Sequence, residues 1–266
     1  MTVSQWRGWH TPSPRHDWHD LSRVLDSDVE RVPSFPAPTV RNYLSMPADP
    51  LNVTELRMVV HVGTHLDAPV HFIPDGPAVE EIPLDRLAGP GVVWRVDAEP
   101  FGIIDAAELQ AADPPLRAGG MVLLDTGWAA RWGTPSYHDN PSLSLAAARW
   151  LVQAGAVLLG VDFATPDLAP ARRPGDFDWP VHQVLLRSGV LVVEHLCGLT
   201  PLAGQRVEVV VGALPVRASD GAPARILARP LPTAPHELSV DAATAAPRPH
   251  PSEAPRPPEM GQASSP

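Results

Sequence analysis

One short stretch of this 266-residue chain concentrates residue types that bind metals and move protons. Residues 61–71 read His-Val-Gly-Thr-His-Leu-Asp-Ala-Pro-Val-His, and the four polar candidates all have odd numbers. They are His61, His65, Asp67 and His71. Imidazole and carboxylate donors suit Zn²⁺ or Mn²⁺, and a bound divalent ion lets a protein activate water near neutral pH. The stretch therefore predicts a metal or catalytic site.

The spacing of these residues constrains the backbone. An extended strand would place His61 and His65 roughly 13 Å apart at ~3.3 Å per residue, too far to share an ion comfortably. The glycine, threonine and proline of the stretch disfavour a helix. We expect a strand over 56–61 that curls at 63–64 into a loop stiffened by Pro69, with the odd-numbered side chains in one pocket. A merely histidine-rich loop is the alternative, and four convergent groups disfavour it.

Between residues 92 and 211, strand-like runs alternate with helical ones. Five apolar runs bounded by glycine or proline predict strands at 92–96, 121–124, 157–161, 190–193 and 207–211. Helices are predicted at 105–111, 144–154 and 180–188. Asp105 and Ser144 are expected N-caps, and Gly155 and Gly189 expected C-terminal glycines. The pattern predicts a single α/β domain with a mixed sheet, spanning residues 17–230.

His182 and Glu194 form a second candidate pair. His182 starts the last predicted helix, and Glu194 ends the strand that follows. A seven-residue helix rises about 10 Å, and a short strand returns a similar distance, so both side chains should lie at the same end of the sheet. Taken alone, such a histidine and glutamate are more often structural than ligands.

The two ends of the chain differ from the centre. Residues 231–266 are rich in proline, alanine, serine and glutamate, which predicts a disordered tail. Residues 1–16 form an irregular arm that carries Trp6 and Trp9, with Trp18 just after it. These tryptophans either pack on the domain surface or cover the active site of the same or a neighbouring subunit.

Composition excludes several classes of function. The net charge is −10, with no basic cluster beyond Arg172-Arg173, which disfavours nucleic acid as a partner. The absence of lysine excludes a lysine Schiff base. No apolar run reaches the about eighteen residues of a membrane span. The first twenty residues lack the apolar region of a secretory signal, so we expect them not to be one. With Cys197 as its single cysteine, expected to be a buried, inert thiol, the chain is expected in the cytoplasm.

Residues 61–71 resemble the HxGTHxDxPxH motif of the metal-dependent cyclase-type hydrolases, a family that includes bacterial kynurenine formamidases and isatin hydrolases. Weaker resemblances follow in the family's order over residues 17–229. They are the opening DLS strand at 20–22, DTGW at 125–128, the GVD strand at 160–162 and the closing GAPAR turn at 221–225. The segment after Gly160 and the loop 172–179 depart from the family pattern. We expect this loop and the N-terminal tryptophans to select the substrate.

The resemblance implies a swivelling β/β/α fold, a small-molecule substrate, a homodimer or tetramer, and one or two Zn²⁺ or Mn²⁺ ions. It implies a first metal site at His61, His65 and Asp67. A second site would use Asp67, His182 and Glu194, and His71 would be the general acid/base. Asp162 could orient a ligand, although a structural role is expected, and His138 and His195 are expected to be structural or solvent-exposed.

The implied reaction is hydrolysis of an aryl formamide, with N-formylkynurenine as the first candidate. Hydrolysis of a cyclic amide such as isatin is the nearest alternative. A metal-dependent cyclase or dehydratase of natural-product biosynthesis is the alternative from another class. A binding protein without catalysis is disfavoured, because the set of ligands and the acid/base is complete.

Overall fold

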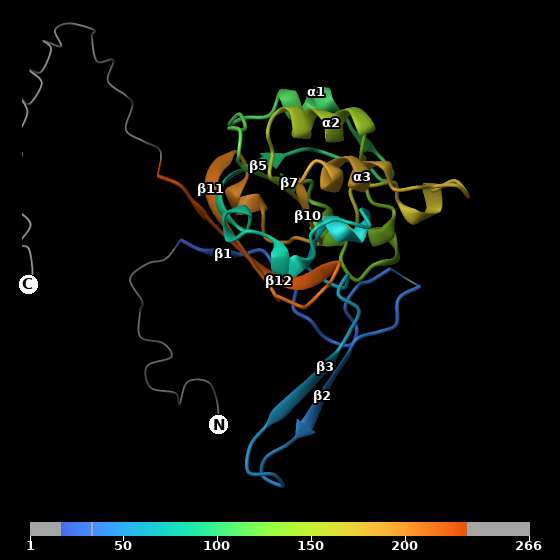
Figure 1. Ribbon diagram of the computed structural model, residues 1–266, viewed down its shortest axis with the longest axis vertical. Coiled ribbons are helices and arrows are strands. Elements are labelled where there is room, and N and C mark those ends of the chain that lie inside the picture. Colours follow the sequence, from blue (N-terminus) through green and yellow to red (C-terminus); the bar gives the residue numbers. More distant parts are fainter. Residues whose placement is uncertain (1–16, 33, 233–266) are drawn as a thin grey trace, which may run out of the picture. The chain divides into compact units, whose positions relative to one another are not determined.

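The computed structural model of the chain describes residues 17–32 and 34–232 (Figure 1). The predicted arm, including Trp6 and Trp9, and the tail from residue 233 lie outside the described residues. An eight-stranded sheet runs in the order β1-β12-β11-β5-β7-β9-β10-β4. Its strands are β1 (His19–Asp20), β4 (His65–Asp67), β5 (Ala88–Arg95), β7 (Met121–Asp125), β9 (Leu158–Val161), β10 (Leu191–Glu194), β11 (Gln205–Ala213) and β12 (Gly221–Pro230).

The sheet is mixed and closes on itself. Strands β5, β7, β9 and β10 are parallel to their neighbours in this group. β11 is antiparallel to β5 and β12, and β4 is antiparallel to both β10 and β12. Asp67 of β4 pairs with Val192 of β10 on one edge and with Gly221 of β12 on the other. The double pairing of β4 is what closes the ring of strands.

Three helices lie together on one face of the sheet (Figure 1), namely α1 (Ala106–Gln110), α2 (Leu145–Gln153) and α3 (Pro180–Arg187). As predicted, the Asp105 side chain accepts a hydrogen bond from the Ala106 amide at 2.8 Å and the Ser144 hydroxyl accepts one from the Ala147 amide at 3.0 Å. Gly155 and Gly189 follow α2 and α3 with φ of +78° and +76°. The five predicted strands and three predicted helices are confirmed within a few residues.

Alternation along the strands divides the core into two layers. In β7, Val122 and Leu124 pack against the helices, whereas Met121 and Leu123 point into the ring of strands. Both layers are almost fully buried. Apolar residues at every position, as in β7, are typical of strands covered on both faces. The mixed α/β domain confirms the predicted fold class.

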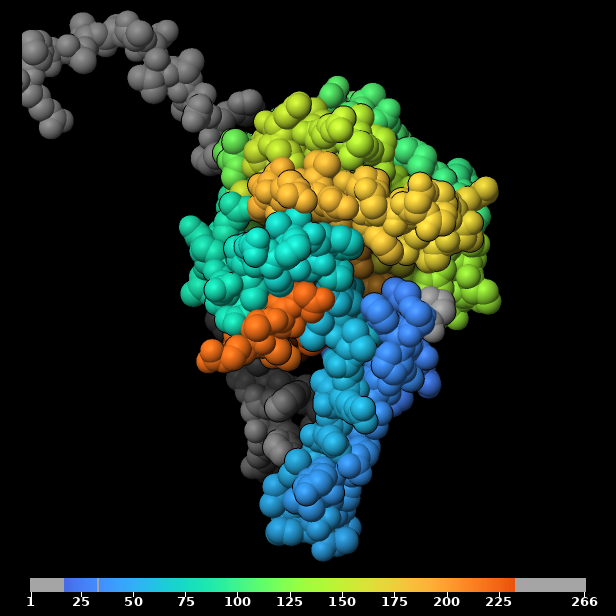
Figure 2. Space-filling view, turned by 45° about the vertical axis from the view of Figure 1, so that its right-hand side comes forward, coloured from blue at the N-terminus to red at the C-terminus, as the bar shows by residue number. Residues whose placement is uncertain are grey.

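Two smaller sheets complete the described chain. β6 (Ile103–Ile104) pairs with β8 (Ser142–Leu143), and β2 (Thr39–Leu44) forms a hairpin with β3 (Val53–Arg57). The hairpin extends away from the sheet (Figures 1 and 2), and its strands are exposed along most of their length. No helix of the described residues is long and apolar enough to span a membrane.

Two local predictions were wrong. The strand expected at 56–61 ends at Arg57, and residues 65–67 inside the motif form a strand instead. The reason is hydrogen bonding, since β4 finds partners on both edges whereas residues 58–64 follow irregular bends. The expected closing turn at 221–225 is the start of β12, because its backbone pairs with β4 and β11.

Candidate metal centre and active site

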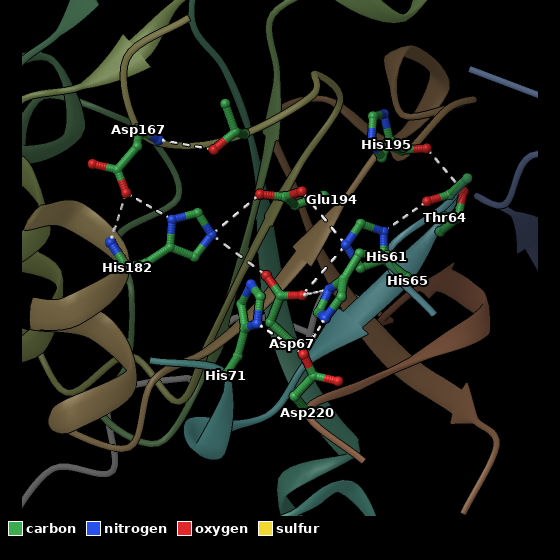
Figure 3. Close-up of polar contacts among 12 residues, drawn as sticks. His61, Thr64, His65, Asp67, His71, Asp167, His182, Glu194, His195 and Asp220 are labelled. Carbon is green, nitrogen blue, oxygen red and sulfur yellow. Dashed lines mark hydrogen bonds and ion pairs between the residues drawn. The ribbon is translucent and has the colours of Figure 1, made fainter. Parts of the chain in front are cut away.

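The six residues predicted from the sequence line one pocket of about 400 Å³. They are His61, His65, Asp67, His71, His182 and Glu194. They come from β4 and the segments before and after it, from the first turn of α3 and from the end of β10 (Figure 3). This placement confirms that the odd-numbered side chains of the motif share a pocket and that His182 and Glu194 lie at the same end of the sheet.

The local fold around β4 directs the first four residues. Side chains alternate along a strand, so His65 and Asp67 lie on one face while Leu66 enters the core between the strands. After β4, the short turn Pro69–His71 brings His71 back to the pocket. Gly221 faces this cluster, where a Cβ atom would lie 2.5 Å from His61 Cε1. A glycine is therefore required beside His61.

Asp67 is the centre of the cluster (Figure 3). Its Oδ1 lies 2.8 Å from His61 Nδ1 and 3.3 Å from His65 Nε2. Its Oδ2 lies 3.4 Å from His182 Nε2. Glu194 faces the same rings, with Oε2 3.5 Å from His65 Nε2 and Oε1 3.2 Å from His182 Nε2. The two carboxylate oxygens of Asp67 thus face two separate groups of donors.

Outer contacts fix two of the imidazoles. Nδ1 of His65 donates to the Gly63 carbonyl at 2.7 Å, and Nδ1 of His182 donates to Asp167 Oδ2 at 2.6 Å. Asp167 also accepts hydrogen bonds from the Val181 and His182 amides at 3.0 Å, which anchors the first turn of α3. A proton held on Nδ1 leaves Nε2 as the electron-pair donor toward the cluster.

Asp220 is a site residue that the sequence analysis missed. Its Oδ2 lies 2.9 Å from His61 Nε2 and 3.1 Å from His71 Nδ1. The two imidazole rings stack with centroids 4.0 Å apart. A single acidic residue in a loop belongs to no periodic pattern that would mark it as a site residue. The one sequence feature that could have indicated Asp220 is its position immediately before the GAPAR segment.

The electrostatics of the cluster follow from burial and from these pairs. Burial lowers the pKa of His61, but Asp67 and Asp220 outweigh it and raise that pKa to about 9. Burial likewise lowers the pKa of His182, and Asp167, Asp67 and Glu194 raise it well above its ordinary value. Burial raises the pKa of the Asp67 carboxyl, whereas His65 and His182 hold it well below its usual range. For His71, burial is dominant and lowers the pKa.

The donor set fits a divalent cation. Asp67 and Glu194 are 1% and 7% exposed, and buried carboxylates are costly unless a positive charge balances them. Ligand atoms about 2.1 Å from an ion in a tetrahedral arrangement lie about 3.4 Å apart, which is the range of the separations around Asp67. Three groups of potential ligands have atoms within 4.8 Å of one another among the described residues. One is the predicted second site, Asp67, His182 and Glu194, and the others are His61, Asp67 and His71, and His65, Glu194 and His195. The chemistry of imidazole and carboxylate donors suits Zn²⁺ or Mn²⁺.

The other candidate residues have different surroundings. His195 is buried rather than solvent-exposed, lines the pocket and pairs through Nδ1 with the Tyr137 hydroxyl at 2.8 Å. His138 also lines the pocket and contacts Glu30 at 3.2 Å. Asp162 accepts hydrogen bonds from the Thr126 amide at 3.2 Å and hydroxyl at 2.5 Å, and burial raises its pKa to about 6.

Two further expectations concern Cys197 and the tryptophans. Cys197 is half-buried rather than buried, and burial raises the pKa of its thiol, so the group is protonated and weakly nucleophilic. Trp18 is half-buried, with the Arg229 guanidinium carbon 4.7 Å from its ring centroid. For this tryptophan, packing on the domain surface is the interpretation that the contacts support.

The sequence is similar to a family model and to two curated proteins. The family model described as "Putative cyclase" matches residues 19–168, more than half of the chain. A kynurenine formamidase from Bordetella petrii is 32% identical over 70% of this chain and 84% of its own length. A kynurenine formamidase from Geobacillus thermodenitrificans is 30% identical over 80% of this chain and 97% of its own length.

A solved structure has the same fold. An isatin hydrolase bound to the product analogue thioisatinate superposes with a TM-score of 0.73 at 21% identity, over 80% of this chain and 91% of that one. At this identity the similarity concerns the fold alone. With the family model and the two relatives, these findings show that the chain belongs to the cyclase family.

Proposed function

We propose that this protein is a metal-dependent amidohydrolase that cleaves the C–N bond of an aryl formamide, with N-formylkynurenine as the first candidate substrate. The observation that carries this proposal is the buried cluster of imidazoles and carboxylates around Asp67, with His71 beside it. The kynurenine formamidases that are about 30% identical over most of their length support the choice of substrate.

The residues of the cluster would form two metal sites. His61, His65 and Asp67 would hold one ion, and Asp67, His182 and Glu194 would hold a second in a site for two. A bound Zn²⁺ or Mn²⁺ supplies a water of lowered pKa and polarises the formyl oxygen. Asp67 would be the residue common to both sites, because its Oδ1 faces His61 and His65 whereas its Oδ2 faces His182.

His71 is the proposed proton carrier. Its Nδ1 is held by Asp220 at 3.1 Å, so Nε2 is the nitrogen left to exchange protons with the substrate. His71 takes a proton from the attacking water as oxygen adds to the formyl carbon. It then gives that proton to the aryl nitrogen as the C–N bond breaks, which yields an aryl amine and formic acid, and the acid releases its remaining proton to solvent as formate.

A cyclic amide such as isatin is the second candidate substrate. Ring opening adds water across the same type of bond, and the protein with the thioisatinate ligand shares this fold. A cyclase or dehydratase reaction with the same ion is the third and is less favoured, since the named relatives are formamidases.

We also propose a homo-oligomer, at least a dimer, in the cytoplasm. The β2–β3 hairpin exposes Tyr43 by 64%, Met46 by 57% and Leu51 by 49%, apolar area that a second copy would cover. The single cysteine of the sequence agrees with a reducing compartment.

The experiment is an assay of the metal-loaded protein with N-formylkynurenine and with isatin in parallel. Formate release from N-formylkynurenine at the higher kcat/KM supports the proposal. Faster opening of isatin would favour the second candidate, and activity on neither would contradict both hydrolase assignments.

A further inference from the structure

The guanidinium of Arg173 is a second polar feature of the pocket, apart from the metal-ligand cluster. Arg173 is half-buried and lines the same pocket as His71, His182 and Glu194. Its Nε donates to the Leu168 carbonyl at 2.8 Å. Within residues 17–32 and 34–232, no carboxylate forms an ion pair with it, and neither Nη atom has a hydrogen-bond partner.

Aromatic rings hold this guanidinium in place. Its central carbon lies 5.4 Å from the Phe177 ring centroid and 5.5 Å from that of Trp179, within the range of cation–π contacts. Trp179 has φ +52°, a left-handed conformation that non-glycine residues rarely adopt. The neighbouring Arg172 takes another direction, exposed and 4.4 Å above the Phe101 ring. The loop thus directs Arg173 into the pocket and Arg172 away from it.

The acidic residues near Arg173 are already engaged. Asp167 accepts from Nδ1 of His182 and from two backbone amides, and Glu194 contacts His65 and His182. Burial lowers the pKa of Arg173, which is the effect of a partly desolvated cation, although Asp167 and Glu194 oppose it. A partly buried cation is costly without an anionic partner, and the planar guanidinium binds a carboxylate through two parallel hydrogen bonds.

The pocket also offers aromatic surface between Arg173 and the cluster. Phe72 and Trp179 both line it, with ring centroids 6.1 Å apart, and the Phe72 ring lies 4.9 Å from that of His182. Such surface favours the aryl part of a substrate. One ligand could therefore occupy the whole pocket. Its anionic group would bind Arg173, its aryl ring would contact Phe72 and Trp179, and its amide would lie at the metal-ligand cluster.

We propose that Arg173 binds a carboxylate of the substrate and makes the enzyme selective for aryl amides that carry an acidic group. This inference rests on the proposed amide hydrolysis and narrows its substrate class. Arg173 would bind the substrate and take no part in the chemical step, so replacing Arg173 should change mainly KM.

The test compares two substrates that differ only at the carboxyl group, N-formylkynurenine and its carboxamide. The wild-type protein should prefer the carboxylate by roughly 10- to 100-fold in kcat/KM, the range of charge-assisted hydrogen bonds. Arg173→Met should remove this preference, with most of the loss in KM for the carboxylate substrate. The matched control Arg172→Met should keep it. Equal losses on both substrates, or a wild type without preference, would overturn the inference.

A binding measurement separates this inference from the proposed function. If the metal-loaded protein cleaves neither substrate, the proposed function fails, and calorimetry with kynurenine and its carboxamide decides about Arg173. Tighter binding of kynurenine by the wild type and by Arg172→Met, lost in Arg173→Met, supports the carboxylate site. Equal affinity of the wild type for both compounds overturns it.

Discussion

At the scale of single residues, the site depends on Asp67. This carboxylate is 1% exposed, and its two oxygens lie within 3.4 Å of nitrogens on three histidines. A small number of neighbouring residues then orient the cluster from outside, notably Asp167 behind His182 and Asp220 behind His71. Replacing Asp67 and replacing one of the orienting residues should therefore have different effects.

Asp67→Ala should abolish both metal binding and turnover, because it removes the carboxylate shared by the two proposed sites. Metal content per chain, measured by mass spectrometry after dialysis, checks this directly. Circular dichroism confirms that the variant is folded. A normal metal stoichiometry in folded Asp67→Ala would refute the ligand assignment.

His71→Ala should keep its metal and lose roughly 10²- to 10⁴-fold in kcat, the usual contribution of a general acid/base. The ring is half-buried beside the cluster, and its Nδ1 is held by Asp220. Steady-state kinetics and metal analysis on the same preparation provide the check. Unchanged kcat would remove His71 from the mechanism.

Asp220→Asn tests the orientation of His71 and His61. The amide keeps the size of the side chain but removes the charge, so we expect a loss of roughly 10- to 100-fold in activity or in metal affinity, as for other partners of metal-site histidines. Titration of metal into the stripped variant distinguishes the two effects. Wild-type activity together with wild-type metal affinity would show that Asp220 is a bystander.

At the scale of elements, the helices and strands that could be predicted are those marked by a pattern in their own residues. The strand at 121–124 and the helix at 144–154 were predicted from apolar runs, a cap and a terminal glycine, and both are present. β4 has three residues, and its partners lie in β10 and β12, more than 120 residues further along the chain. Its existence depends on those partners, so no local pattern could reveal it.

The same distinction applies to the site. The four motif residues come from one short segment, 61–71, whose bends bring them to one pocket, and His182 and Glu194 join them through one helix–strand unit. Asp167 and Asp220 lie in loops whose direction is set by packing rather than by periodicity. Their contacts could not be predicted from the sequence for that reason.

Gly160→Ala tests the close packing of β9 against its surroundings. An added Cβ would lie 2.6 Å from Leu123 Cδ2 and 2.7 Å from Leu196 Cδ1. We expect a loss of roughly 1–3 kcal/mol in the free energy of unfolding, the usual effect of overpacking a core. Chemical denaturation measures it, with Gly175→Ala as the control because its Cβ would meet no atom within 4 Å. Equal stabilities of the two variants would contradict the observed packing.

At the scale of the whole molecule, the β2–β3 hairpin extends away from the sheet and, among residues 17–32 and 34–232, leaves most of its length exposed. Tyr43→Asp should shift a dimer toward monomer, because it places a charge on apolar surface that a second copy would cover. Light scattering coupled to size-exclusion chromatography measures the mass. Leu84→Asp is the control, since Leu84 is 81% exposed on the short turn Leu84–Arg86, outside the hairpin. A monomeric wild type would rule out the proposed oligomer.

The central claim is that the Asp67 cluster holds the ion on which hydrolysis depends, and the most direct test is reconstitution. The protein is stripped of metal, and Zn²⁺ or Mn²⁺ is added back while formate release from N-formylkynurenine is followed. We expect the stripped protein to be inactive and activity to return in proportion to one or two ions per chain, with no recovery in Asp67→Ala. Undiminished hydrolysis by the stripped protein would contradict the account.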